Sequence, residues 1–204
     1  LLSKAEGALF GKGAAEAKSV EAAAKESAAV NAAGNEAKAE AGKFTGRFET
    51  QGLTQDPATF PDGVKLLQEL EKTGLSRAEA AIQAERLILS GNTLPVARPI
   101  DITDRLYKVV PAGNTPSQAT AYWVTETELS ALKQNPALIA ERLGLPPSQF
   151  NANAFDVYVI RPNKGAVVFE SKVAETTLDG AKFGQGGATQ TLVPNRTLFT
   201  PPVK

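Results

Sequence analysis

Large apolar residues are distributed unevenly along the 204 residues of this chain. The first fifty residues contain 15 alanines but only five Leu, Ile or Val side chains. Alanine has the highest helix propensity, yet its side chain buries little apolar area. Most of the Val, Ile, Tyr and Phe residues, and the single Trp, lie after residue 100. We therefore expect a weakly stabilised helical region at the N-terminus and a hydrophobic core in the second half.

Residues 1–42 consist mainly of Ala, Lys and Glu, with several glycines among them. Lys18, Glu21 and Lys25 are spaced three and four residues apart, so they lie on one face of a helix. Isolated alanine-rich helices are weak in water. The segment is therefore predicted to be a frayed helix or linker, or alternatively a delivery or stalk segment that needs little stability.

Two amphipathic helices are predicted to follow. Residues 63–73 place apolar side chains on one face and end before Gly74. Residues 77–90 follow Ser76, which forms a capping box with Glu79 three positions later.

Pro95 and Pro99 then break further helix and mark a linker. This pattern predicts a helical delivery or linker region at residues 1–94 and a second domain at residues 95–204. No run of 18 apolar residues occurs, so no membrane-spanning helix is expected. The chain begins at Leu1 without an initiator Met, which favours a piece of a longer protein.

The second domain is predicted to be α+β, a compact and mainly antiparallel β domain with short helices. Short helices are expected at residues 126–133 and 136–145. A glycine-rich loop at residues 180–187 precedes the last strand, and the turn at residues 162–165 predicts a hairpin between the strands that flank it. Strands are predicted at residues 105–110, 121–125, 155–160, 166–171 and 189–193.

The chain contains no His, Cys or Met, which excludes several kinds of chemistry. A Ser-His-Asp triad, a Cys nucleophile and a Cys/His zinc site all require residues that are absent, and no metal site is predicted. Residues 1–100 carry 12 basic and 13 acidic side chains, and residues 101–204 carry 10 and 9. Neither half has the basic excess typical of a protein that binds many phosphates.

The segment at residues 180–190, G-A-K-F-G-Q-G-G-A-T-Q, is the most informative candidate for a site. Gly186 and Gly187 allow close approach of a ligand to the backbone, and consecutive amide groups can cradle phosphate. A flexible hairpin loop is the alternative interpretation. Gln190 places a polar side chain where the glycine loop meets an apolar strand.

The run from residue 158 to residue 194 (Y-V-I-R-P, V-V-F-E-S-K-V-A and F-G-Q-G-G-A-T-Q-T-L-V-P) resembles the tuberculosis necrotizing toxin family. That resemblance implies an NAD glycohydrolase on an ADP-ribosyltransferase-like fold. It also implies that Gln190, at the position of the family's catalytic Gln, is catalytic. The family has a His in the strand where this chain has Asp156, so this part of the pattern is not kept.

A broader resemblance rests on S-G-N-T-L-P, L-Y-K-V-V-P-A-G, A-Y-W-V-T, F-D-V-Y-V-I-R-P and G-G-A-T-Q-T-L-V-P-N-R-T-L-F. Together these motifs are similar to the C-terminal ends of filamentous-haemagglutinin-like proteins, which include toxins of contact-dependent growth inhibition. The resemblance implies a toxin that is secreted or surface-borne within a larger protein and delivered to the target-cell cytoplasm. It implies a cognate immunity protein as partner, and a host factor in the target cell is a further possible partner.

An NAD-cleaving site can be assembled from residues that the chain contains. Gln190 can position the ribose or the attacking water, and Glu126 or Glu170 can stabilise the cationic transition state. The diphosphate can bind to Arg105, Lys108 or Arg196, because guanidinium groups match phosphate geometry.

Tyr122 or Trp123 can stack on nicotinamide. NAD is then the substrate, and no cofactor is predicted. Structural roles are the alternatives: the two aromatic residues can belong to the core, Lys108 and Asp156 can face water, and Arg196 can hold the C-terminal tail.

Two other functions remain open from the sequence. A metal-independent ribonuclease acting on tRNA needs a base, an acid and a cation, which a carboxylate, Lys108, Tyr158 and Arg161 can supply. The near-zero charge of the second half argues against it, although a local basic groove is compatible with that total. A non-catalytic adhesion or binding tip is the third interpretation.

Overall fold

The computed structural model describes residues 48–145 and 154–204. Residues 46–204 form one compact unit, so the chain divides between residues 45 and 46 and not near residue 95 as the sequence predicted. The helix predicted within residues 1–42 lies outside the described residues.

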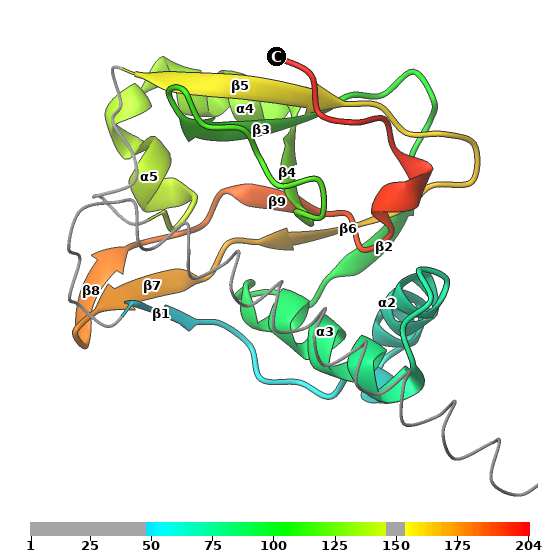
Figure 1. The fold of residues 1–204 in the computed structure, drawn as a ribbon. Coiled ribbons are helices and arrows are strands. Elements are labelled where there is room, and N and C mark those ends of the chain that lie inside the picture. The colour runs from blue at the N-terminus through cyan, green and yellow to red at the C-terminus, as the bar shows by residue number, and fades with distance from the viewer. Residues whose placement is uncertain (1–47, 146–153) are drawn as a thin grey trace, which may run out of the picture. The chain divides into compact units, whose positions relative to one another are not determined.

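Two antiparallel sheets form the framework of this unit (Figure 1). The larger sheet has the strand order β2-β6-β9-β4-β3-β5, and the smaller one has the order β1-β7-β8. The strands are β1 (Phe48–Gln51), β2 (Val96–Pro99), β3 (Leu106–Pro111), β4 (Tyr122–Thr125), β5 (Phe155–Ile160), β6 (Val167–Lys172), β7 (Glu175–Leu178), β8 (Ala181–Gly184) and β9 (Thr189–Leu192).

Two of the helices begin at residues that the sequence marks as caps. The Ser76 hydroxyl accepts a hydrogen bond from the Glu79 amide, and the Glu79 carboxylate accepts one from the Ser76 amide, so the predicted capping box is confirmed. Thr125 caps the next helix through the amide of Glu128. The helices are α2 (Pro61–Glu71), α3 (Arg77–Leu89), α4 (Glu126–Gln134) and α5 (Ile139–Arg142), with 3-10 turns η1 (Pro57–Thr59), η2 (Pro136–Leu138) and η4 (Arg196–Leu198).

Helices α2 and α3 share a hydrophobic core with the larger sheet. Leu66, Leu70 and Leu87 pack in one cluster with Phe169 of β6 and Leu192 of β9, and all five side chains are almost fully buried. The core therefore includes residues from the first half of the sequence, and the prediction that it lies in the second half is wrong. The sequence pattern underestimates this part, because the five large apolar side chains of the two short helices are buried only when a sheet covers them.

The segment predicted as a linker is strand β2, which pairs with β6 at the edge of the larger sheet. Proline is compatible with such a position because an edge strand leaves amide groups on one side unused by the ladder. The two prolines therefore mark the limits of an edge strand and not a domain boundary.

The hairpin predicted between residues 155–160 and 166–171 is wrong. Both strands exist, as β5 and β6, but β5 pairs with β3 while β6 pairs with β2 and β9. The turn between them carries the chain across to another part of the sheet, where the Asn163 amide bonds the carbonyl of Leu198 in the C-terminal segment. The predicted glycine loop likewise contains a strand, β8, which forms a pair with β7.

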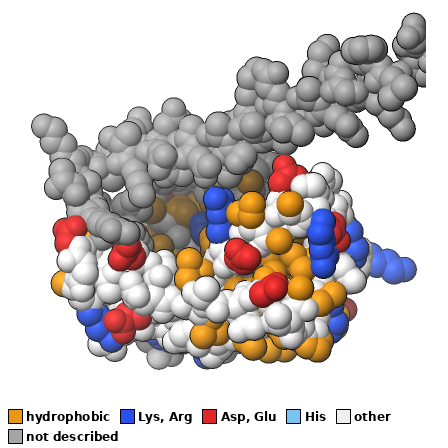
Figure 2. Space-filling view, turned by 90° about the horizontal axis from the view of Figure 1, so that it is seen from below, with side chains coloured by type: hydrophobic (Ala, Val, Ile, Leu, Met, Phe, Trp, Pro, Cys, Tyr) orange, Lys and Arg blue, Asp and Glu red, His pale blue; other side chains and the backbone are white. Residues whose placement is uncertain are grey.

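Figure 2 shows the side of the molecule on which α2 and α3 lie. Hydrophobic side chains are gathered there among scattered charges of both signs. Among the described residues, exposed apolar side chains include Ile82 and Leu89 on α3 and Val96 on β2. None of the helices within the described ranges is long and apolar enough to span a bilayer.

Candidate functional site

A cavity of about 280 Å³ is lined by residues of both sheets. The larger sheet contributes Lys108 from β3, Tyr122 from β4 and Gln190 from β9. The smaller sheet contributes Thr176, and the C-terminal end of α3 contributes Ser90. Polar side chains that are far apart in the sequence therefore meet around one hollow.

Gln190 is the second residue of β9 and lies opposite Ser171 of the neighbouring strand β6. Its side chain is 5% exposed. The Nε2 atom donates one hydrogen bond to Ser90 Oγ at 2.9 Å and another to Ser171 Oγ at 3.0 Å. These two bonds hold the carboxamide in one place at the cavity wall.

The two glycines before this strand form a tight turn. Gly186 has φ +66° and Gly187 has φ +84°, which are left-handed conformations that favour glycine. Their amide groups already donate to the carbonyls of Glu141 and Val173. These glycines therefore supply the path of the chain into β9, and their amides are not available for a phosphate.

The Gly186→Ala substitution is expected to lower the free energy of unfolding by about 2 kcal/mol, and Gly187→Ala by about 1 kcal/mol. A methyl group at residue 186 would clash with the backbone oxygens of Val173 and Ala174, whereas nothing lies near one at residue 187. Urea denaturation of the two variants measures the difference. Equal losses would contradict the role assigned to the Gly186 contact.

Lys108 reaches the cavity from the middle of β3 and is half-buried. Its Nζ donates to the carbonyl oxygen of Tyr122 at 3.1 Å and lies 6.0 Å from the centroid of the Tyr122 ring. Burial lowers the pKa of Lys108 to about 8, because the ammonium loses part of its hydration. The Lys108 side chain is therefore an ammonium that can bind an anion at neutral pH, and it loses its proton as the pH rises past about 8.

This pKa predicts a pH-dependent difference in stability. Between pH about 8 and pH 10.5 the folded chain binds fewer protons at Lys108 than the unfolded chain, so stability rises with pH across that window. A Lys108→Met variant lacks this contribution. Urea denaturation near both ends of the window should show a larger increase in the free energy of unfolding for the wild type than for Lys108→Met. An equal increase in the two proteins would contradict the low pKa.

The two neighbouring aromatic residues of β4 have different surroundings. Tyr122 is 39% exposed, and it lies beside the Ser90 hydroxyl. Burial of the phenol group raises the pKa of Tyr122. The hydrogen bond with Ser90 and the charge of Arg86 act in the opposite direction. Trp123 borders the cavity but is only 2% exposed, and its indole donates to the Thr120 carbonyl at 3.0 Å. The ring that can meet a ligand is therefore that of Tyr122.

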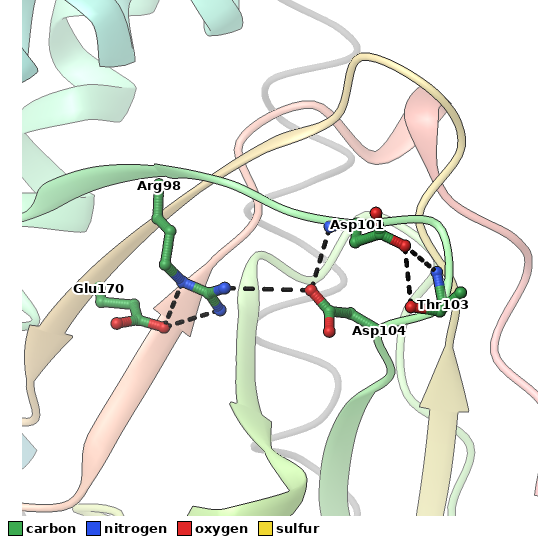
Figure 3. A network of polar contacts seen from close by, with 5 residues as sticks. All are labelled: Arg98, Asp101, Thr103, Asp104 and Glu170. Carbon is green, nitrogen blue, oxygen red and sulfur yellow. Dashed lines mark hydrogen bonds and ion pairs between the residues drawn. The ribbon is translucent and has the colours of Figure 1, made fainter.

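Arg105 and Glu126 line a second cavity of about 410 Å³, separate from the one that contains Gln190. Arg98 crosses this region and contacts Glu170 at 2.9 Å and Asp104 at 3.9 Å (Figure 3). The structure thus groups Gln190 with Lys108 and Tyr122, and it places both carboxylates considered for charge stabilisation elsewhere.

Arg196 and Asp156 both contact the C-terminal segment. The Arg196 guanidinium donates to carbonyls of Gln118 and Thr200 and lies 5.1 Å from the Trp123 ring centroid. Asp156 accepts from the Gly113 amide and pairs with Lys204 at 2.8 Å, contacts that lower its pKa. Neither side chain is part of the Gln190 cavity.

Comparison with protein-family models and with curated proteins gives no match. Among solved structures, Rhs1-CT in complex with its cognate immunity protein RhsI1 aligns with a TM-score of 0.40 and 20% identity, over 57% of this chain and 86% of that chain. Tse6 in complex with Tsi6 aligns with a TM-score of 0.40 and 13% identity, over 68% of this chain and 91% of that one. At this level of similarity neither alignment supports an argument about function.

Two site residues were not found from the sequence. Ser90 precedes Gly91 at the end of a predicted helix, where it is typical of a helix terminus, and Ser171 lies inside a predicted strand. Only the pairing of β6 with β9 and the packing of α3 bring both hydroxyls to Gln190.

Proposed function

We propose that residues 46–204 form a toxin domain of the contact-dependent growth inhibition class that cleaves NAD. The observation that carries this proposal is the grouping of Gln190, Lys108 and Tyr122 around one cavity. The match of Gln190 to the G-G-x-T-Q segment of the necrotizing toxin family supports it. The observed helices and antiparallel sheets are compatible with the α+β fold that the same resemblance implies.

The reaction breaks the bond between nicotinamide and C1′ of the ribose. Water supplies the new oxygen at C1′, nicotinamide leaves with the bonding electron pair, and ADP-ribose and a proton are the other products. Positive charge develops on the ribose as nicotinamide departs. Groups that orient the sugar and accept its hydrogen bonds lower the barrier, because they are arranged before the charge appears.

Three residues of the cavity have roles in this proposal. Gln190 orients the ribose or the attacking water, Tyr122 stacks on the nicotinamide ring, and the Lys108 ammonium binds a diphosphate oxygen. The cavity, at about 280 Å³, lies just below the usual range of ligand sites, about 300–1,000 Å³, so in this proposal it holds only the reacting half of the dinucleotide. Among the described residues, no Asp or Glu lines it.

The proposed setting is a larger protein that delivers this domain to the cytoplasm of a target cell. A cognate immunity protein is the proposed partner, the kind of partner that is bound to Rhs1-CT in its solved complex. A host factor in the target cell is a further proposed partner.

The test is expression of the whole chain in bacteria, with NAD content and tRNA integrity measured in the same cultures. Loss of NAD with intact tRNA is the expected result. Cleaved tRNA with normal NAD would favour a ribonuclease, and growth arrest without either change would favour a non-catalytic binding domain.

A further inference from the structure

A carboxamide such as that of Gln190 can present either its oxygen or its NH₂ group to a ligand, and the two choices select opposite ligand chemistry. An oxygen in the cavity accepts hydrogen bonds, whereas an NH₂ group donates them. The partners of the Ser90 hydroxyl determine which of the two is present.

Ser90 has one hydroxyl proton, and the Leu87 carbonyl and the Tyr122 hydroxyl both lie beside it. The Tyr122 hydroxyl has a proton of its own and can donate to Ser90 Oγ, so only the carbonyl needs the Ser90 proton. Ser90 Oγ donates to the carbonyl oxygen of Leu87 at 2.6 Å, at the C-terminal end of α3, where helix carbonyls lack partners within the helix. Toward Gln190 the hydroxyl can therefore act only as an acceptor. The group that faces Ser90 at 2.9 Å must be the NH₂ group of Gln190.

Ser171 receives the second proton of the same NH₂ group at 3.0 Å. Both donors of Gln190 are then used inside the protein. No described residue donates to Gln190 Oε1, and the side chain lines the cavity, so Oε1 is the end that remains for a ligand.

We infer that Ser90 is a positioning residue: by passing its proton to the end of α3, it holds the Gln190 carbonyl oxygen toward the cavity. At this part of the cavity wall, Gln190 Oε1 is then a hydrogen-bond acceptor that selects a ligand hydroxyl or a water molecule. The orientation stands on geometry alone, and only its effect on catalysis rests on the proposed function.

The orientation can be measured without any substrate. In the full chain labelled with ¹⁵N, the side-chain amide protons of Gln190 are identified as the signals lost in Gln190→Leu. Their exchange with water is expected to be roughly fivefold faster in Ser90→Ala, the factor for one lost hydrogen bond. Ser90→Thr, which keeps a hydroxyl, should restore slow exchange.

Ser130→Ala is the matched control, because Ser130 lies exposed on α4 away from the cavity. Ser171→Ala provides a second variant, with faster exchange also expected, should Ser90→Ala fail to fold. Unchanged exchange in Ser90→Ala, or in Ser171→Ala if only that variant folds, would overturn the inference.

Kinetics give the second measurement. If the chain cleaves NAD, Ser90→Ala should lower kcat about tenfold with little change in KM, because a misoriented acceptor weakens the transition state more than binding. If the wild type leaves NAD intact, but the Gln190 amide protons exchange faster in Ser90→Ala as predicted, the proposed function is rejected and the orientation of Gln190 is retained. A Ser90→Ala variant with normal kcat and fast exchange rejects the catalytic role of that orientation.

Discussion

Replacing Gln190 by alanine is expected to reduce the proposed cleavage of NAD about 100-fold or more, the size of effect seen when one preorganised polar contact to a developing charge is lost. The side chain is the polar group of β9 that reaches the cavity, and both its donors are occupied by serines. Alanine at this position leaves no acceptor for the ribose or the attacking water. Nicotinamide release by the purified chain measures the loss.

Gln185→Ala is the matched control for this experiment, because Gln185 is an exposed glutamine of the same glycine-rich segment. It should retain the wild-type rate. Gln190→Ala should remain folded, since two neutral hydrogen bonds contribute about 1–3 kcal/mol in total. A folded Gln190→Ala variant with normal activity would remove Gln190 from the site for any reaction.

The largest loss of stability is expected from Trp123→Ala, at about 3–5 kcal/mol. The indole is almost fully buried with Leu106, Ile160, Val168 and Phe199, and its N–H is bonded to a backbone carbonyl. Alanine leaves a cavity in this cluster and an unpaired carbonyl. Urea denaturation followed by circular dichroism measures the difference.

Tyr122→Ala is the paired experiment on the neighbouring residue. Because the Tyr122 side chain is 39% exposed and lines the cavity, its loss should affect stability much less and should raise KM for NAD. If Trp123→Ala weakened substrate binding without lowering stability, the assignment of stacking to Tyr122 would be wrong.

Local features of the fold could be predicted from the sequence. The capping box of Ser76 and the Thr125 cap depend on residues three positions apart, so the chain itself displays them. Most strands were also predicted, since alternation of apolar side chains is a local pattern. The division of the chain was not, because the packing of α2 and α3 on β6 and β9 involves residues about a hundred positions apart.

Strand pairing could not be predicted for a similar reason. A turn between two strands favours a hairpin, yet β6 already pairs with β2 and β9 on its two sides. Residues 155–171 do not by themselves indicate which strands pair with β6. The pairing depends on the whole sheet.

The site could be predicted only in part. The family resemblance indicates Gln190, and the structure places it with Lys108 and Tyr122 in one cavity. Arg105 and Glu126 are compatible with the same chemistry by type, but their positions just before β3 and at the start of α4 place them at another cavity. Residue type indicates what a side chain can do, whereas its location depends on contacts that the sequence does not display.

The position of Ser90 at the end of α3 bears on how such a domain can be exchanged between proteins. A recombination breakpoint in the proline-containing segment near residue 95 would look harmless, since it falls between a helical part and a strand-rich part. It would nevertheless separate Gln190 from one of its two hydroxyl partners and Phe169 from the helices that cover it. A segment that keeps this site intact must therefore include α2 and α3. It must also include β1, the partner strand of β7, so a breakpoint that preserves it falls before Phe48.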